Sequence, residues 1–318
     1  MNELFFTTLQ SISAALFKIF LIALVGALLV RRKVFSSEDV SSFSSLMVKV
    51  LLPAMIFSKI LLTLKPGEFP EWWILPLIGL GLIVIGVLFA MLFFANNLRA
   101  KKNLIPICSM QNAGYLALPL GQAIYPDQFD LYALYCFLII IGLNPILWSI
   151  GKFLNTADQN QKFSWRQLVT PPLVAILIAI GLVLSGIHRF IPPSIVQVID
   201  LTGSATVPMA NFILGAVLGS ISLRIWPPIS DILKVISIKF FIIPLITVLL
   251  MLYFNLKATE PLLGDVILIQ ATLPPAIAIM IQIKNWGGEV QQTGSLMLIS
   301  YTFCLIAIPF WLAIWKIL

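Results

Sequence analysis

Hydrophobic residues occupy most of this chain in long blocks, and short polar segments separate the blocks. The apolar windows predict ten helices, near residues 7–30, 40–64, 72–95, 103–125, 129–152, 168–187, 194–219, 231–254, 263–284 and 290–316. A helix needs about 20 mostly apolar residues to cross the roughly 30 Å hydrocarbon core of a bilayer. The pattern therefore predicts an all-α polytopic membrane protein.

The first two helices have recognisable beginnings. The first follows a nearly neutral segment, residues 1–10, without the basic start or small-residue cleavage site of a signal peptide, so we expect a structural helix. Ser36, followed three residues later by Asp39, predicts a capping box that starts the second helix.

Composition supports a membrane protein. Hydrophobic residues make up 60% of the 318 residues, charged residues only 10%, and the mean hydropathy is +1.03. Soluble domains carry about 25% charged residues, so water could not solvate the surface of this chain.

Three cysteines, Cys108, Cys136 and Cys304, lie inside apolar blocks without metal-ligand or redox spacing, and we interpret them as packing residues.

Membrane topology explains the net charge of +7 better than nucleic-acid binding does, because the basic residues are concentrated in every second loop. Twelve fall on one side: Arg31, Arg32, Lys33, Arg99, Lys101, Lys102, Lys152, Lys162, Arg166, Arg224, Lys234 and Lys284. The other side holds Lys65, Arg189, Lys257 and Lys316, together with Glu68, Glu71, Asp127, Asp130 and Glu260. The positive-inside rule then places both termini outside the cytoplasm. We expect the protein to lie in a plasma membrane or a bacterial inner membrane.

A polar stretch divides the predicted helices into two sets of five. We expect a first repeat over 1–152, a cytoplasmic linker over 153–166 and a second repeat over 167–318. An odd number of helices per half makes the second half enter the membrane from the opposite face, which is an inverted repeat. Pro53 and Pro208 are 155 residues apart, and Gln111 and Gln270 are 159 apart, although coincidence can also produce two such spacings.

Two helices place polar residues and helix breakers near their middle. The segments are Gln111–Pro119 in the fourth helix and Gln270–Ala276 in the ninth. Proline removes an amide donor, and lipid cannot satisfy the backbone groups that are set free. We expect both helices to be unwound, near Gly114–Pro119 and Leu273–Ala276, and to cross near the membrane centre.

Paired broken helices in two inverted halves indicate a transport site at the repeat interface. The half-helix N-termini would favour an anionic group there. The alternative is that these prolines only kink packed helices. The amides of Gln111, Asn112 and Gln270 favour a polar site, because unpaired polar groups are costly at that depth.

The chain resembles the auxin efflux carrier family, which includes plant auxin exporters and bacterial permeases for malate, malonate and similar acids. The resemblance covers nearly the whole chain and rests on Arg31–Lys33 followed by Leu51–Phe57, Gln111–Tyr115 with Pro119, Gly203–Phe212 with Gly215, and the break at Pro274 and Pro275.

This resemblance implies two inverted five-helix repeats with crossing helices 4 and 9, a scaffold of helices 1, 2, 6 and 7, elevator-like alternating access and often a homodimer. By residue, it assigns Asn112 and Pro119 to the first crossover and Pro274 and Pro275 to the second. The ninth helix departs from the pattern, because no asparagine matches Asn112 there. The candidate substrate-binding residues are Gln111, Asn112, Gly114, Tyr115, Pro119, Asn211, Gln270, Thr272, Pro274 and Pro275.

Charged residues inside apolar blocks are functional candidates, because charge is costly in a bilayer. Lys18, Lys59 and Asp200 are candidates for coupling or charge compensation, and Asp200 could exchange protons, pair with Lys59 or lie in a solvated vestibule. Lys49, Lys59 and Lys239 are near predicted helix ends, where snorkelling to the interface is the alternative.

Together these observations predict a secondary transporter of a small organic anion such as a carboxylate, with efflux or proton- or potential-linked permeation. The alternatives are a sodium- or proton-coupled symporter or antiporter of the bile-acid-symporter-like fold, and a membrane receptor that does not transport. The expected partners are the anion, the lipid bilayer, a coupling proton or sodium ion and a second copy of the chain, without nucleic acid. The sequence shows no nucleotide-binding or catalytic motif, so we expect no enzyme activity, cofactor or metal.

Overall fold

The computed structural model describes residues 2–155, 168–221, 225–286 and 290–318, and these residues form helices joined by turns. Up to residue 155 the elements are α1 (Asn2–Arg31), α2 (Ser37–Leu46), η1 (Met47–Leu51), α3 (Leu52–Thr63), η2 (Pro70–Trp73), α4 (Ile74–Phe93), η3 (Ala95–Asn97), α5 (Leu104–Ser109), α6 (Ala117–Ile124), η4 (Pro126–Gln128), α7 (Phe129–Ile146), η5 (Leu147–Gly151) and α8 (Lys152–Asn155).

From residue 171 onward they are α9 (Pro171–Leu184), η7 (Ile187–Phe190), α10 (Pro193–Ser204), α11 (Thr206–Gly219), α12 (Ile229–Ser237), η8 (Ile238–Ile242), α13 (Ile243–Tyr253), α14 (Leu256–Thr259), α15 (Pro261–Thr272), α16 (Ala278–Trp286) and α17 (Val290–Ile317). Most of the predicted linker, residues 156–166, lies outside the described residues, as do Lys162, Arg166 and Arg224.

Seven of the described helical stretches are long and apolar enough to cross a membrane. They are Glu3–Arg31, Ser37–Thr63, Pro70–Phe93, Pro126–Leu154, Pro193–Gly219, Ile229–Tyr253 and Val290–Ile317. The other three predicted segments are shorter for local reasons. α9 begins at two prolines and ends before Gly186, whose φ of 74° is left-handed, and the fourth and ninth predicted helices are each split in two.

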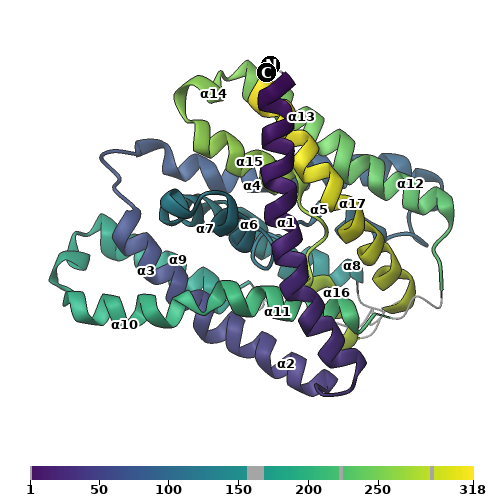
Figure 1. The fold of residues 1–318 in the computed structure, drawn as a ribbon, viewed down its shortest axis with the longest axis horizontal. Coiled ribbons are helices and arrows are strands. Elements are labelled where there is room, and N and C mark those ends of the chain that lie inside the picture. Colours follow the sequence, from purple (N-terminus) through teal and green to yellow (C-terminus); the bar gives the residue numbers. More distant parts are fainter. Residues whose placement is uncertain (1, 156–167, 222–224, 287–289) are drawn as a thin grey trace.

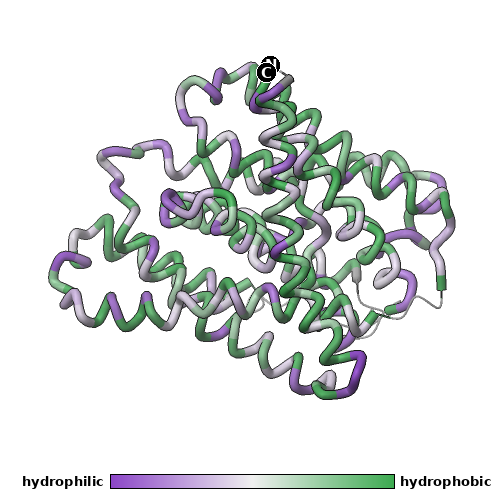
Figure 2. Tube along the Cα trace, viewed as in Figure 1, coloured by the Kyte–Doolittle hydropathy of each residue, from purple (hydrophilic) through white to green (hydrophobic). Residues whose placement is uncertain are grey.

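Polar residues gather at the ends of the bundle, and both termini lie side by side next to α14 (Figures 1 and 2). The capping box is present as predicted, because Asp39 N–H donates to Ser36 Oγ at 3.1 Å and Ser36 N–H donates to Asp39 Oδ2 at 2.8 Å. At the end away from the termini, Arg31 donates to the Gly219 carbonyl and Lys284 donates to Ser220 Oγ. These contacts bring the C-terminal ends of α1 and α11 together with α16.

The closest helix pairing joins α1 and α11 through small residues. A Cβ added at Gly215 would fall on the Ala23 carbonyl, and one added at Gly219 would meet the Ala27 backbone. Gly203 similarly contacts the backbone of Met55 in α3. Small residues allow membrane helices to approach this closely, so these glycines are required for the packing of α11 on α1 and of α10 on α3.

Candidate functional site

The fourth predicted helix is interrupted between α5, which ends at Ser109, and α6, which begins at Ala117. We predicted unwinding near Gly114–Pro119, and this boundary was wrong at its C-terminal side. Pro119 is the third residue of α6, where a helix has no partner for the amide that proline lacks. The first break therefore spans residues 110–116, with Pro119 starting the next helix.

The second interruption lies between Thr272, the last residue of α15, and Ala278, the first of α16. It agrees with the prediction of unwinding near Leu273–Ala276. Leu273 has extended backbone with ψ of 144°, and the next two residues, Pro274 and Pro275, provide no amide donors. The double proline therefore ends α15 and leaves carbonyl acceptors free.

The two breaks lie against each other and share backbone hydrogen bonds. Asn112 N–H donates to the Pro274 carbonyl at 2.9 Å, and Ala276 N–H donates to the Met110 carbonyl at 3.0 Å. Gln111 and Pro275 thus form an isolated antiparallel bridge. Backbone groups released from two helices are satisfied in this way without water, which lipid depth requires.

Asn112 holds this junction through both ends of its amide. Its Nδ2 donates to the Tyr301 hydroxyl at 2.6 Å, and its Oδ1 accepts from Tyr115 N–H at 3.1 Å. The Tyr301 hydroxyl donates in turn to the Pro275 carbonyl at 3.0 Å. Asn112 is 2% exposed, so this network fixes the first break, the second break and α17 relative to one another.

A cavity of about 80 Å³, which we call the inner pocket, lies beside the first break. Gln111, Asn112, Gly114 and Tyr115 line it, together with Asn144 of α7. The Gln111 Nε2 group is buried and makes no hydrogen bond within the described part of the chain. This amide can therefore donate to a molecule in the inner pocket.

Other predicted site residues lie in the second half. Gln270 is fully buried, and its Nε2 donates to Cys136 Sγ at 3.5 Å. Thr272 Oγ1 bonds the carbonyls of Leu268 and Ile269 in its own helix. Asn211 is 4% exposed in α11 and is not one of the residues that line the inner pocket. Ala276 and Ala278 are the lining residues that the second break and α16 contribute.

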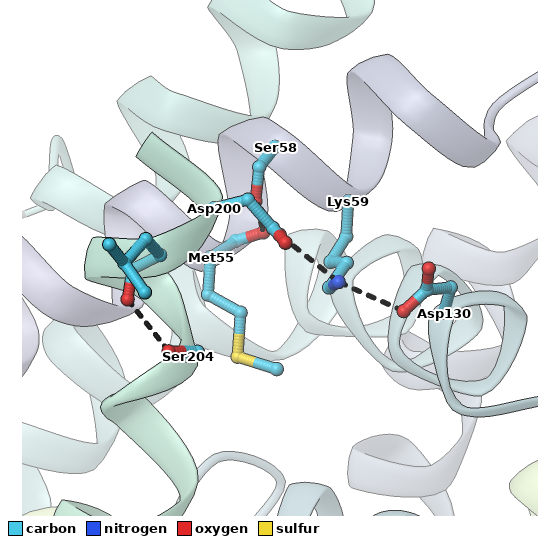
Figure 3. A network of polar contacts seen from close by, with 7 residues as sticks. Met55, Ser58, Lys59, Asp130, Asp200 and Ser204 are labelled. Carbon is cyan, nitrogen blue, oxygen red and sulfur yellow. Dashed lines mark hydrogen bonds and ion pairs between the residues drawn. The ribbon is translucent and has the colours of Figure 1, made fainter. Parts of the chain in front are cut away.

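The charge candidates occupy different environments. Lys59 of α3 joins two carboxylates, with Nζ 2.9 Å from Asp130 Oδ1 and 3.0 Å from Asp200 Oδ1 (Figure 3). Ser58 also donates to Asp200 at 2.9 Å. These contacts join α3 and α10 to α7. The predicted pairing of Asp200 with Lys59 is therefore present in the structure.

Two further lysines differ from each other in burial. Lys18 is exposed on α1, within a largely apolar helix. Lys239 is 1% exposed in η8, so our alternative that it snorkels to the interface was wrong. Lys239 lies within the continuous helical stretch Ile229–Tyr253, and η8 packs against α4, α5 and α15.

Sequence reasoning missed Tyr301, Asn144 and Trp148. Tyr301 lies in a continuous apolar helix and carries no local sign that it contacts the breaks. Asn144 was identifiable, because an amide followed by Pro145 inside an apolar block resembles the pattern used for the breaks. Trp148, one turn further along, lines the same pocket.

Long apolar helices, two breaks joined by backbone hydrogen bonds, and a largely apolar pocket that contains the amides of Gln111, Asn112 and Asn144 define a polytopic membrane protein. The model of the membrane transport protein family matches residues 11–164 and 156–312. The chain belongs to this family, the auxin efflux carrier family, as its sequence predicts. It is also similar to an uncharacterized transporter of Methanocaldococcus jannaschii, with 22% identity over 286 aligned residues. The aligned region covers 87% of this chain and 90% of the relative.

Proposed function

We propose that this membrane transporter is a secondary carrier of small organic anions and that the inner pocket binds the substrate. The observation that carries the proposal is the buried, unpaired Gln111 amide beside two interrupted helices. A buried donor without a partner is unfavourable by about 1–3 kcal/mol, and an anionic ligand would supply the missing acceptor. The start of α16 adjoins the same pocket through Ala278 and adds partial positive charge.

The proposed architecture is ten membrane-crossing helices in two inverted repeats of five, with the split fourth and ninth helices crossing at the breaks. The antiparallel bridge between Gln111 and Pro275 supports such a crossing. Lys59 supports a boundary between a scaffold and a moving body, because it bonds Asp200 of α10 and Asp130 of α7. Homodimer formation and a location in the plasma or bacterial inner membrane complete this proposal.

Transport would require movement. Pockets for small ligands typically hold about 300–1,000 Å³, which exceeds the inner pocket by several-fold. An elevator-like shift of the body that carries the breaks would open it.

Transport can be tested in proteoliposomes loaded with unlabelled malate, malonate or indole-3-acetate, with the matching labelled compound outside. Counterflow by wild type, and its loss in Gln111→Leu without loss of thermal stability, would support the proposal. Binding of these anions without counterflow would favour the receptor alternative. If neither binding nor counterflow is observed, the proposal that the protein carries organic anions is refuted.

Coupling is tested with the same vesicles. Replacing sodium with potassium at a fixed potential would abolish uptake by a sodium symporter, whereas a proton ionophore would abolish proton-driven accumulation. If flux persists under both treatments, efflux driven by the membrane potential is supported. A potential of 100 mV supplies about 2.3 kcal/mol for each elementary charge that crosses the membrane.

Topology is tested with single cysteines in a cysteine-free background. Cysteine in place of Lys102 should react with an impermeant reagent only after the membrane is opened, and cysteine in place of Lys257 should react in intact cells. The reverse pattern would overturn the predicted placement of both termini outside the cytoplasm.

A further inference from the structure

A second cavity, of about 510 Å³, lies at the end of the bundle away from the termini, and we call it the vestibule. The ends of α1 and α11, the elements α2 and η1, and α16 line it. It shares Val48, Tyr115, Trp148 and Ala278 with the inner pocket, so the two cavities adjoin. Its volume lies within the range for small ligands, unlike that of the inner pocket.

Two lysines give the vestibule its charge. Lys49 and Lys284 both line the cavity and both are exposed. Lys284 donates to Ser220 Oγ at 2.8 Å, and this hydroxyl is a neutral partner. The acidic residue of the lining is Glu38, in the first turn of α2, so the formal balance of these three groups is +1.

The vestibule also has hydroxyl groups for a polar ligand. Ser41 and Ser45 lie one turn apart on α2 and line the cavity. Tyr115 is 7% exposed, and its hydroxyl has no hydrogen-bond partner within the described part of the chain. Tyr115 lines both cavities and therefore connects the vestibule with the inner pocket.

We propose that the vestibule is a separate anion-binding site, in which Lys49 and Lys284 hold a small carboxylate before it reaches the inner pocket. This inference rests on the proposed transport of organic anions. The walls between the polar groups are apolar, including Val30, Val217 and Ile281. Low-dielectric walls concentrate the field of the lysines inside the cavity and raise the local anion concentration.

The two cavities then have different tasks. The vestibule supplies full positive charge and room for the anion, whereas the inner pocket supplies the neutral amide of Gln111. Removing the vestibule charge should weaken capture at low substrate concentration and leave the later steps unchanged. The expected signature is a higher KM at constant kcat.

The test measures malate uptake into proteoliposomes by the double variant Lys49→Gln/Lys284→Gln. We expect KM to rise about ten-fold, with kcat within about two-fold, since charged clefts raise local substrate concentration by about 10-fold or more. The difference should shrink near 1 M salt, where the screening length is only about 3 Å. Lys49→Arg/Lys284→Arg keeps both charges and should retain the wild-type KM.

Two further variants give the inference independent checks. Glu38→Gln should lower KM, because it removes the negative charge of the lining. Lys102→Gln is the matched control, a lysine of the same predicted side that does not line the vestibule, and its KM should stay unchanged. If wild type is active and the KM of Lys49→Gln/Lys284→Gln is unchanged, the vestibule is not an anion-binding site, whereas the proposed carrier function stands. Inactive wild type would overturn the carrier and the vestibule with it.

Discussion

The two breaks have similar sequences but unequal roles. The first contributes side chains to the inner pocket, among them Gln111 with its unpaired Nε2 group. The second contributes backbone acceptors, because the carbonyls of Pro274 and Pro275 receive hydrogen bonds from Asn112 N–H and the Tyr301 hydroxyl. Pro274 and Pro275 can present carbonyls but no amides, so their hydrogen bonds take donors from Asn112 and Tyr301, whereas the following Ala276 N–H donates back to the Met110 carbonyl. The two breaks therefore contribute different chemical groups to the junction although both contain proline.

The largest effect is expected where the two breaks are joined. From the sequence alone, Asn112→Ala should reduce transport and leave folding largely intact. The structure changes this expectation, because the substitution removes the donor to Tyr301 Oη and the acceptor of Tyr115 N–H. Each lost buried bond is worth about 1–3 kcal/mol, so thermal or chemical unfolding in detergent should show a loss of about 3 kcal/mol together with lower transport.

Tyr301→Phe is the matched check, since it removes the hydroxyl that links Asn112 to Pro275. It should lower stability in the same assay. Wild-type stability in both variants, with malate affinity reduced by Asn112→Ala alone, would show that Asn112 contacts substrate and does not hold the junction.

The next effect concerns affinity at the first break. Gln111→Leu removes the unpaired donor of the inner pocket, and malate affinity measured by calorimetry should fall about ten-fold, since hydrogen bonds to charged groups are worth about 1.5–3 kcal/mol. Stability should not fall, because no protein partner loses a bond. A variant that binds malate as wild type does would remove Gln111 from the site.

A smaller effect is expected at Gln270, which lies in α15 shortly before the second break. Gln270→Leu loses one weak contact with Cys136 Sγ and removes a buried Oε1 that has no partner in the described residues. Malate affinity should change by less than about two-fold, which is below about 0.4 kcal/mol. A loss as large as that of Gln111→Leu would show that the two breaks contact substrate equally.

The smallest effect is expected for Thr272→Val. The Thr272 hydroxyl bonds carbonyls of its own helix, so its removal takes nothing from the inner pocket. Transport kinetics should match wild type, and stability should fall by less than about 1 kcal/mol. Strongly reduced uptake at normal stability would place this hydroxyl in the transport path.

Local patterns predicted much of the fold because each pattern acts within one helix. The capping box at Ser36 and Asp39 formed as expected, and the double proline ended α15 where predicted. The first break was predicted too far along the chain, because Pro119 was read as interrupting a helix that it begins. Proline can interrupt a helix or occupy its first turn, and the residues next to Pro119 do not distinguish these two roles.

The sequence by itself determined that this chain is an α-helical membrane protein of the auxin efflux carrier family and that its fourth and ninth apolar segments contain helix breakers. Hydrophobicity and proline chemistry act over a few turns, so they are visible along the chain. Only the tertiary structure decided that Asn112 bonds Tyr301, 189 positions away, and that Lys59 bonds Asp130 and Asp200. Those partners are selected by how whole helices pack, and packing is set by shape across the entire bundle.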